Sequence, residues 1–502
     1  MLEFCYSLPY LLLLVPLLTS IMCCFFKQNA MNFFIALTTI VFLICLSTYL
    51  AINILSFGHL DYKVNESILS IISEYRLGLF NIFFVLVLLF VKLLSLLYFR
   101  YEIKHYNNQR FFYALFLINC FGLLGILLTN NIFNLYVYLE IYSFTFYALI
   151  TNYDNEQSAD IAIKYFFNGV VGSIFILFSL TCLYVLFQTS DISYIFQKVN
   201  NVSVENYLIL SCLFLIFVCG IFSKFFTFWL YLFQVKKSKN VINFLFITLM
   251  FLHIFIGLYL LIKSIFFIFG VKIVFGFMSF DIVLSVLGCI MVVYYSYCLI
   301  KTRNLFQIVS YLCIINLGFI LINIGLGNVY SLASAFLFIL EYLSSNLMLF
   351  IFVSYLIYNF DSSDINFLNI VGNKKNIILS LAFLFAILAK TIIPIGTGFT
   401  NKLFYAQSLG KGGVLAGLTF LIPMIFNVVI IGYVCFKFIK VMKFSKYNKG
   451  IYYDLVATQN KGSINKIYIY SLHVLLVFSI LITVFSGSVA ELSYAAAESI
   501  IQ

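Results

Sequence analysis

The chain has 502 residues, of which 64% are hydrophobic and only 9% are charged. Soluble proteins carry about 25% charged residues, so this composition excludes a soluble globular protein and indicates an integral membrane protein. The formal net charge of +11 is carried mostly by loops and helix ends, where Lys and Arg set membrane topology, so it predicts orientation in the membrane and no binding of nucleic acid.

Runs of about 18 or more apolar residues recur from end to end, and they predict an all-α polytopic membrane protein with about 14 transmembrane helices. The predicted spans are 7–25, 31–56, 78–99, 111–129, 131–150, 162–187, 206–233, 241–269, 274–300, 305–325, 330–358, 377–409, 412–441 and 467–487. We group them as helices 1–3 in 1–110, two five-helix units in 111–269 and 270–441, and a loop with the last helix in 442–502.

Two of these runs contain residues that interrupt a regular helix. Gly220–Trp229 (GIFSKFFTFW) places Lys224 inside the seventh run, and Ile392–Lys402 (IIPIGTGFTNK) combines Pro394 with two glycines. Such residues leave backbone groups that protein or water must satisfy at membrane depth. Transporters built from inverted repeats carry broken helices at matching positions, so we expect two inverted five-helix repeats with broken helices 7 and 12.

Glu140 lies in the middle of the apolar stretch Leu135–Tyr147, where a charge opposes membrane insertion by about 2.5–3.5 kcal/mol. Lys224 lies equally deep in its own run. If the two side chains are paired, they keep each other charged; if they separate, the loss of hydration drives each toward its neutral form. A Glu–Lys pair whose separation changes therefore acts as a proton switch.

Four other ionisable residues allow a structural and a functional interpretation. His253, in mid-helix, is either a neutral histidine bonded to a carbonyl or a proton relay. Glu341 is either a satisfied buried acid or a relay, and Lys402 is either a helix-end lysine or a functional cation beside unwound backbone. We treat Glu341 and the nearby charge of Lys390 as secondary candidates for a proton path.

Three lysines have mainly structural interpretations. Lys92 lies within about ten residues of the end of its run, so its apolar stem lets the ammonium group snorkel to the membrane surface. Lys263 and Lys301 are at run ends, where we expect interfacial anchors.

The sequence contains no motif for redox or nucleotide chemistry. It lacks a cysteine cluster for an iron–sulfur centre, a G-x-G-x-x-G after a strand and a P-loop. Its twelve cysteines lie largely inside apolar runs, which indicates small buried residues. We therefore expect no cofactor on this chain, and the energy for transport must come from a gradient or a partner.

Five blocks of the sequence occur in the order and spacing of one known family. They are Leu139–Tyr147 (LEIYSFTFY), Ser158–Gly172 (SADIAIKYFFNGVVG), Ser310–Gly318 (SYLCIINLG), Tyr342–Leu347 (YLSSNL) and Ile392–Lys402 (IIPIGTGFTNK). These blocks resemble those of the antiporter-like subunits of proton-pumping NADH:quinone oxidoreductase, respiratory complex I. The resemblance covers about residues 80–410 and is closest to subunit 2, because the paralogues usually carry a His and a Lys in the helix of YLSSNL.

The resemblance implies a proton channel of about fourteen helices in the membrane arm of that complex. The family's carboxylate falls on Glu140, its sixth-helix lysine on Lys164, its eighth-helix lysine on His253 and its twelfth-helix lysine on Lys402. Lys224 fits the seventh-helix lysine by its distance from Glu140. In the family this Glu and Lys form the pair, and the positions of His253 and Lys402 form the onward path.

The seventh-helix block departs from the family's pattern. Where the family has P-F-H-x-W, this chain reads FFTFW at Phe225–Trp229. An alignment on Trp229 places Gly220 at the lysine position, with Lys224 one helical turn later on the same face. Two registers therefore remain open for the partner of Glu140.

The predicted function is that of a proton-translocating, non-redox subunit of NADH:ubiquinone oxidoreductase. Heavy use of Phe, Tyr, Ile, Asn and Lys is typical of an AT-rich organelle genome, so we expect a multi-pass protein of the mitochondrial inner membrane. Expected partners are other membrane-arm subunits, including antiporter-like ones, and phospholipids. The complex that it resembles uses NADH, FMN, iron–sulfur clusters and ubiquinone on other subunits. The alternatives are a cation/proton antiporter subunit of a multi-subunit exchanger and a scaffold that has lost pumping.

Overall fold

The structure, a computed structural model, describes residues 2–57, 60–63, 74–102, 109–151, 156–226, 244–360, 397–408, 414–444, 477 and 485–501. Within these ranges, ten helices are long and apolar enough to cross a membrane. The prediction of an all-α polytopic membrane protein is therefore confirmed. The predicted count of fourteen is not confirmed. The predicted spans 131–150 and 412–441 are helical but are not among the ten, and the spans 377–409 and 467–487 lie largely outside the described residues.

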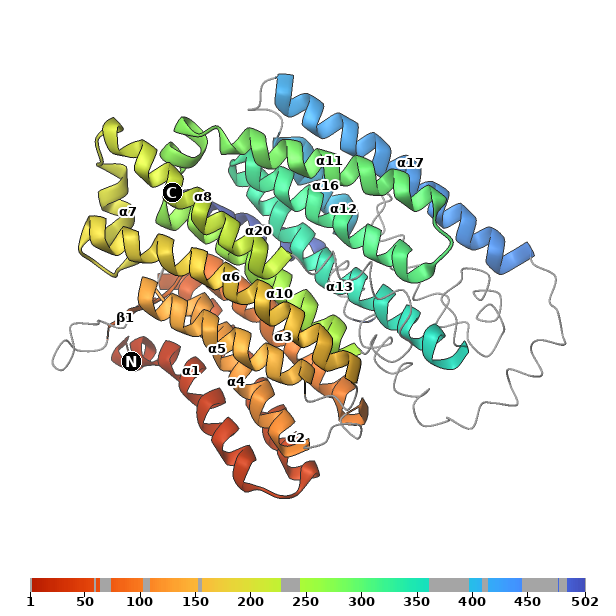
Figure 1. Ribbon diagram of the computed structural model, residues 1–502, viewed down its shortest axis with the longest axis horizontal. Helices are drawn as coiled ribbons and strands as arrows, with labels where there is room; N and C mark the ends of the chain where they lie inside the picture. Colours follow the sequence, from red (N-terminus) through yellow and green to blue (C-terminus); the bar gives the residue numbers. More distant parts are fainter. Residues whose placement is uncertain are drawn as a thin grey trace. The chain divides into compact units, whose positions relative to one another are not determined.

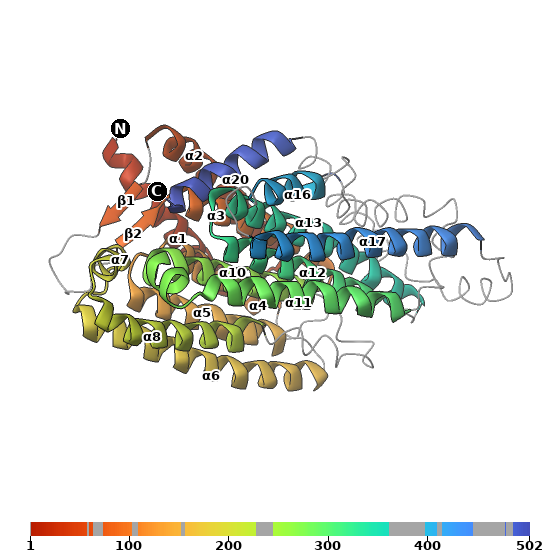
Figure 2. The same cartoon turned by 90° about the horizontal axis from the view of Figure 1, so that it is seen from above.

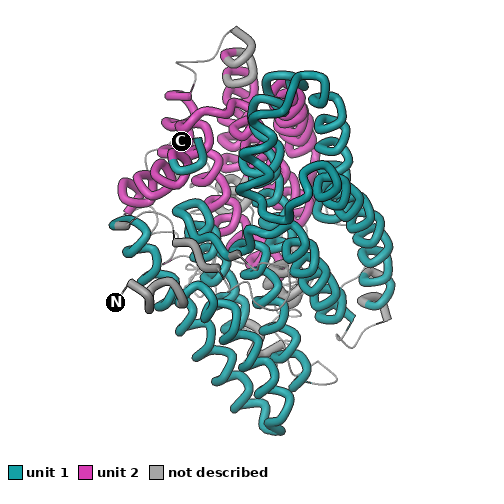
Figure 3. Tube along the Cα trace, turned by 90° about the vertical axis from the view of Figure 1, so that its left-hand side faces the viewer, with its two compact units in different colours: residues 1–228, 248–279, 499–502 teal, residues 229–247, 280–498 magenta. Residues whose placement is uncertain are grey.

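The chain divides into two compact units, which Figure 3 draws in different colours. Unit 1 consists of residues 1–228, 248–279 and 499–502, and unit 2 consists of residues 229–247 and 280–498. The predicted inverted relation between two five-helix repeats stays a prediction.

Unit 1 is a layered bundle of helices. Its helices are α1 (Leu2–Phe25), α2 (Asn29–Phe57), α3 (Leu79–Glu102), α4 (Gln109–Leu128), α5 (Ile132–Thr151), α6 (Glu156–Phe187), α7 (Ile192–Asn200), the 3-10 turn η2 (Val204–Asn206), α8 (Tyr207–Ile221) and all but the first residues of α10 (Phe244–Lys263). Helix α4 packs against α1 and α5, and α6 packs against α5 and α8 (Figures 1 and 2).

Three stretches of unit 1 follow a wider, π-helical path. They are η3 (Phe222–Phe226), η4 (Ser264–Ile268) and η5 (Lys272–Phe277). The first continues directly from α8 and lies within the predicted break at Gly220–Trp229. Single π-helical turns inside α-helices are frequent at functional sites, and η3 carries Lys224.

The helices of unit 1 differ in how much of their surface is buried. In α10, 94% of the apolar span is buried, whereas in α6 only 39% is buried. The outward face of α6 carries large apolar side chains such as Phe167, Ile174 and Val185, which are 59–65% exposed. Because lipid tails solvate such side chains well, this face of α6 is suited to contact with the membrane.

Two short elements of unit 1 were not expected from the sequence. Strands β1 (Leu60–Lys63) and β2 (Glu74–Leu77) form an antiparallel pair in which Leu60 lies opposite Leu77. Helix α7 begins after Asp191, whose side chain accepts a hydrogen bond from the Ser193 backbone N–H and so caps the helix. Both elements are too short to produce an apolar run of membrane-spanning length.

Unit 2 is also helical in its described parts. Its helices are α11 (Phe280–Lys301), α12 (Leu305–Leu326), α13 (Val329–Phe360), α16 (Thr397–Gln407), α17 (Val414–Phe444) and most of α20 (Ser486–Ile501), whose last residues belong to unit 1. Helix α12 packs between α11 and α13, while α17 packs on α11 and α16 on α13. Of the second predicted break, Ile392–Lys402, residues 397–402 form the first part of α16, and the residues before them lie outside the described ranges.

Candidate functional site

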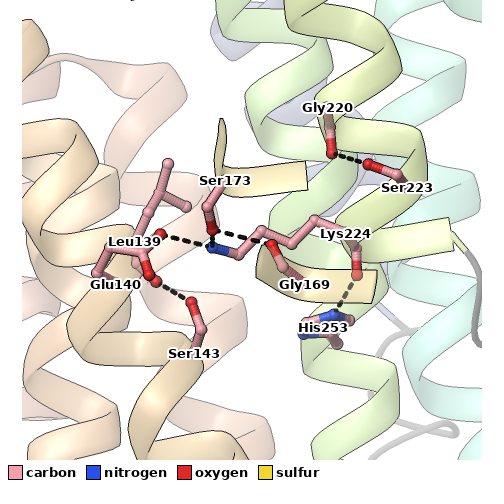
Figure 4. A network of polar contacts seen from close by, with 9 residues as sticks. All are labelled: Leu139, Glu140, Ser143, Gly169, Ser173, Gly220, Ser223, Lys224 and His253. Atoms are coloured by element: carbon pink, nitrogen blue, oxygen red, sulfur yellow. Dashed lines mark hydrogen bonds and ion pairs between the residues drawn. The ribbon is translucent and has the colours of Figure 1, made fainter. Parts of the chain in front are cut away.

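Glu140 and Lys224 form an ion pair inside unit 1 (Figure 4). The Lys224 Nζ lies 2.9 Å from the Glu140 Oε1, and it also donates to the Ser173 Oγ at 2.7 Å. The side chain of Lys224 is 1% exposed, and that of Glu140 is 23% exposed. One partner is therefore fully enclosed, while the other retains a route to the surface of the unit.

The structure selects between the two registers of the seventh helix. Lys224 is the residue whose side chain meets Glu140. Gly220 instead lies where α6 and α8 cross, because a Cβ there would be 2.8 Å from the Gly172 carbonyl oxygen. This close approach of two glycines allows the helix backbones to nearly touch, and it brings Ser173 within reach of Lys224.

His253, on α10, is bonded to the backbone of Lys224. Its Nε2 lies 2.8 Å from the Lys224 carbonyl oxygen, and its Nδ1 lies 2.9 Å from the Tyr142 hydroxyl. A carbonyl oxygen only accepts, so Nε2 carries a proton, and in the neutral ring Nδ1 accepts from Tyr142. Phe146 stacks on the ring with centroids 4.6 Å apart. The bond to a carbonyl that the structural interpretation expects is present, and the role of His253 as a proton relay stays a prediction.

The cluster therefore brings together three ionisable residues from three helices. Glu140 comes from α5, Lys224 from the π-helical end of α8 and His253 from α10. The acid and the amine share a direct hydrogen bond along which a proton can pass, whereas the imidazole contacts only the backbone carbonyl oxygen of Lys224. Among the described residues, no three His, Cys, Asp or Glu side chains gather to hold a metal ion.

Lys164 does not join this cluster. It lies on α6, and its side chain is exposed. Its family position therefore does not place it beside Glu140 in this chain, and its role in a proton path stays a prediction.

The other predicted residues belong to unit 2. Glu341 on α13 is 2% exposed, and its Oε2 accepts a hydrogen bond from the Asn401 Nδ2 at 2.7 Å. Lys402, the next residue on α16, is 5% exposed. Lys390 lies outside the described residues. Glu341 and Lys402 thus meet the expectation of buried ionisable groups, and the sequence did not indicate the contact with Asn401.

Lys92 does not snorkel, contrary to its interpretation from the sequence. It is fully buried in α3, where its Nζ donates to the Asn119 Oδ1 at 2.6 Å and lies 4.4 Å from the centre of the Phe116 ring. The Asn119 amide in turn donates to the Thr145 Oγ1 at 3.0 Å. Asn119, a lone amide inside an apolar run, was the signal that Lys92 had a partner within the protein.

Lys263 is not an interfacial anchor either. It is only 6% exposed, and its Nζ donates to the Thr129 carbonyl oxygen at 2.7 Å. Thr129 directly follows the last residue of α4, where carbonyl groups have no partner within the helix. The apolar run misled the prediction because the end of α10 is covered by protein and continues into η4.

Comparisons with known proteins agree with this fold. Residues 129–429 match the family described as "NADH:quinone oxidoreductase/Mrp antiporter, TM". A Staphylococcus aureus (strain JH9) protein named as an antiporter subunit, mnhD2, is 25% identical over 327 residues. That alignment covers 64% of this chain and 62% of the relative, so the chain matches less than two thirds of the curated relative's length.

Two solved structures share the fold. A chain of the Mrp complex from Dietzia sp. DQ12-45-1b has a TM-score of 0.78 with 14% identity, over 99% of this chain and 97% of that chain. A chain of the membrane-bound sulfane sulfur reductase, an archaeal respiratory membrane complex, has a TM-score of 0.73 with 18% identity, over 99% and 98%. Because the family match covers more than half of the sequence, the chain belongs to the NADH:quinone oxidoreductase/Mrp antiporter transmembrane family.

Proposed function

We propose that this chain moves protons across a membrane as a non-redox subunit of a larger complex, and that the Glu140–Lys224 pair is its switch. The observation that carries the proposal is the enclosed Lys224, which meets a carboxylate through its side chain and an imidazole through its backbone. An ion pair that is largely buried contributes little net stability, because the loss of hydration offsets the attraction between the charges. Its position deep in apolar runs therefore favours a functional role.

The strength of the ion pair sets the energy that a conformational change must supply. At the observed 2.9 Å, two unit charges attract by about 6 kcal/mol in a medium with a dielectric constant of about 20. Exposure of Glu140 weakens this attraction. When the pair separates, the enclosed lysine loses its counter-charge, and the release of its proton relieves the cost of an unpaired buried cation.

His253 is the next proton site in this proposal. Movement of the Lys224 backbone at η3 changes the hydrogen bond to Nε2, so opening of the pair and the protonation state of His253 are coupled. From His253 the proposed path continues to Lys402 in unit 2, with Glu341 and Lys390 as secondary candidates. The Tyr142 hydroxyl is bonded to the Nδ1 of His253, and we include Tyr142 as a relay in the same path.

A partner membrane subunit is expected to cover Glu140. On the same face of α5, Val137 and Phe144 are 51% and 56% exposed, one turn before and after the carboxylate. A partly exposed carboxylate between two apolar side chains is unfavourable against lipid and favourable against a protein surface that hydrates or pairs it. Both structural neighbours are chains of multi-subunit membrane complexes, which supports this expectation.

The complex that supplies the energy is proposed in two forms. In the first, quinone reduction elsewhere in a complex I-like assembly, in the mitochondrial inner membrane, drives the change in the Glu140–Lys224 separation. In the second, the chain is a subunit of a cation/proton exchanger, which the relative named as an antiporter subunit favours. Co-purification with NADH-oxidising subunits supports the first form, and sodium-dependent proton movement without NADH supports the second.

The function is tested by Glu140→Gln in the purified complex, reconstituted into liposomes with a pH-sensitive dye. Glutamine keeps the size of the side chain and removes its charge, so proton movement falls by about tenfold or more, which corresponds to 1.4 kcal/mol in the barrier. Lys301→Gln, at the exposed end of α11, removes one charge away from the site and is the matched control. Normal proton movement by Glu140→Gln in a fully assembled complex would refute the role of the Glu140–Lys224 pair.

A further inference from the structure

A chain of buried polar contacts runs from α3 through α4 to α5 in unit 1. Lys92 on α3 is fully buried, and its Nζ donates to the Asn119 Oδ1 on α4 at 2.6 Å. The Asn119 Nδ2 donates to the Thr145 Oγ1 at 3.0 Å and, more weakly, to the Tyr142 carbonyl oxygen at 3.4 Å. Thr145 and Tyr142 both belong to α5. We call Lys92, Asn119 and Thr145 the α5 clasp.

The hydrogen bonds of the α5 clasp can run in one direction only. The Thr145 hydroxyl has one hydrogen, which it donates to the carbonyl oxygens of Ile141 and Tyr142, each 2.8 Å away. Toward Asn119 this hydroxyl therefore accepts, as does the Tyr142 carbonyl oxygen. The Asn119 amide must present its NH₂ group to α5 and its oxygen to α3, where Lys92 supplies the donor. Lys92 thus fixes which way the Asn119 amide points.

This role requires a donor at Lys92 and does not require a charge. A lysine amine donates through an N–H bond in its neutral form as well as in its charged form. An apolar side chain in its place leaves the Asn119 oxygen buried without a donor, which is unfavourable. The amide can then turn over, which puts its oxygen against the Tyr142 carbonyl oxygen and breaks the bond to α5.

The α5 clasp acts on the part of α5 that carries the proposed proton switch. Glu140 contacts Lys224, and two residues later the Tyr142 hydroxyl contacts the His253 Nδ1 at 2.9 Å. Gly122 of α4 lies against α5 at the same level, since a Cβ there would be 3.0 Å from the Tyr142 backbone nitrogen. Helix α4 therefore holds α5 by a close backbone contact and by the hydrogen bonds of Asn119.

A small rotation of α5 about its axis is enough to break the contacts of the switch. Side-chain atoms lie about 5–6 Å from the axis of a helix, so a rotation of about 10° moves them by about 1 Å. This movement takes the 2.9 Å bonds of Glu140 and Tyr142 to about 3.9 Å, beyond hydrogen-bond range. Directed hydrogen bonds resist such a rotation, whereas a van der Waals contact resists mainly approach.

We propose that Lys92 is a positioning residue of the proton switch, because through Asn119 it fixes the rotation of α5 and so the contact between Tyr142 and His253. The titratable residues that contact the His253 ring in the described part of the chain are Tyr142 from α5 and Lys224 from η3. Lys92 carries no proton along the path, since Asn119 links it to the backbone side of α5. The proposal rests on the proposed function, because it assigns Lys92 to the same switch.

The test measures proton movement as a function of pH in the purified complex, reconstituted into liposomes. Lys92→Met removes the donor, so we expect proton movement to fall by about tenfold, within the roughly hundredfold loss that a misplacement of about 1 Å can cause. Its pH profile shifts in the same direction as that of Tyr142→Phe. Lys92→Gln keeps an N–H donor without a charge, and it restores most of the rate and the original pH profile.

A double variant separates positioning from independent effects. In Lys92→Met with Tyr142→Phe, we expect a shift of the pH profile no larger than in Tyr142→Phe alone, because both changes act on one contact. Thr145→Val removes the acceptor on α5 and keeps the shape of the side chain, so it reproduces the shift of Lys92→Met. Thr145→Val decides the question if Lys92→Met does not assemble.

Ser95→Ala is the matched control on α3. Ser95 is buried, and its Oγ donates to the Lys92 carbonyl oxygen at 2.8 Å. Its removal deletes a buried hydrogen bond one turn from the Lys92 side chain and leaves the bond to Asn119 in place. We expect the pH profile of Ser95→Ala to be that of the unmodified complex, and a shift equal to that of Lys92→Met contradicts the proposal.

Three further results would overturn the proposal. The first is a lower melting temperature of Lys92→Met with an unchanged pH profile, as for a residue that only stabilises the fold. The second is a pH shift in the double variant that equals the sum of the two single shifts. The third is a loss of transport in Lys92→Gln as large as in Lys92→Met. Each of these leaves the loss in Glu140→Gln intact, whereas failure of the proposed function abolishes that loss.

Discussion

Replacement of Gly172 by alanine tests whether the close crossing of α6 and α8 positions Lys224. A Cβ on Gly172 would lie 2.7 Å from the Lys224 Cβ and 2.8 Å from the Gly220 carbonyl oxygen. Ordinary contact begins at 3.4 Å, so the two backbones must separate by about 0.6 Å. That shift lengthens the 2.7 Å bond between the Lys224 Nζ and the Ser173 Oγ to about 3.3 Å, beyond the usual range for a hydrogen bond.

The expected cost of this substitution is about 1–3 kcal/mol in the free energy of unfolding, as for other overpacked sites. The better helix propensity of alanine offsets up to about 1 kcal/mol of it. We expect a lower melting temperature in detergent and slower proton movement in liposomes. Gly432→Ala in α17 is the control, because a Cβ there meets nothing within 4 Å. A Gly172→Ala complex with normal melting and normal transport would refute the role of the crossing.

Three further substitutions test other parts of the account. Tyr142→Phe removes the hydroxyl bonded to the His253 Nδ1. The free energy of unfolding falls by about 1–3 kcal/mol because a buried polar group loses its partner, and the pH profile of transport changes. An unchanged pH profile excludes Tyr142 as a relay. Lys92→Met removes the donor to the Asn119 Oδ1 and lowers the melting temperature. The double variant Lys92→Met, Asn119→Leu removes both partners and partly restores the melting temperature. A double variant that melts as low as Lys92→Met contradicts the pairing. Lys164→Gln leaves proton movement near normal because the side chain is exposed, and a loss as large as that of Glu140→Gln places Lys164 in the path.

The membrane helices of this chain are predictable because they depend on composition over about 20 residues. The described parts of α4, α12, α13 and α17 begin and end close to the predicted runs. Helix α5 forms as predicted although it is not among the ten helices that are apolar enough to count as spans, because Asn134, Glu140 and its tyrosines lower its hydropathy. The β1–β2 hairpin was missed because it depends on pairing between segments that the apolar pattern does not mark.

The site was predictable only in part, for a different physical reason. Glu140 and Lys224 stood out because each places a charge deep in an apolar run, and family spacing paired them across 84 residues. The bond from His253 to the Lys224 carbonyl depends on the π-helical path at η3, which sequence periodicity does not specify. Lys92 and Lys263 were misjudged because their partners, an amide and a helix-end carbonyl, lie on other helices.

The central claim is that the Glu140–Lys224 pair opens during turnover and changes its protonation. Infrared difference spectroscopy on the whole complex, compared between resting and energised states, tests it directly. We expect the band of a protonated carboxyl group to appear in the energised state of the unmodified complex and to be absent in Glu140→Gln. A band that persists in Glu140→Gln, or no carboxyl band in the unmodified complex, contradicts the claim.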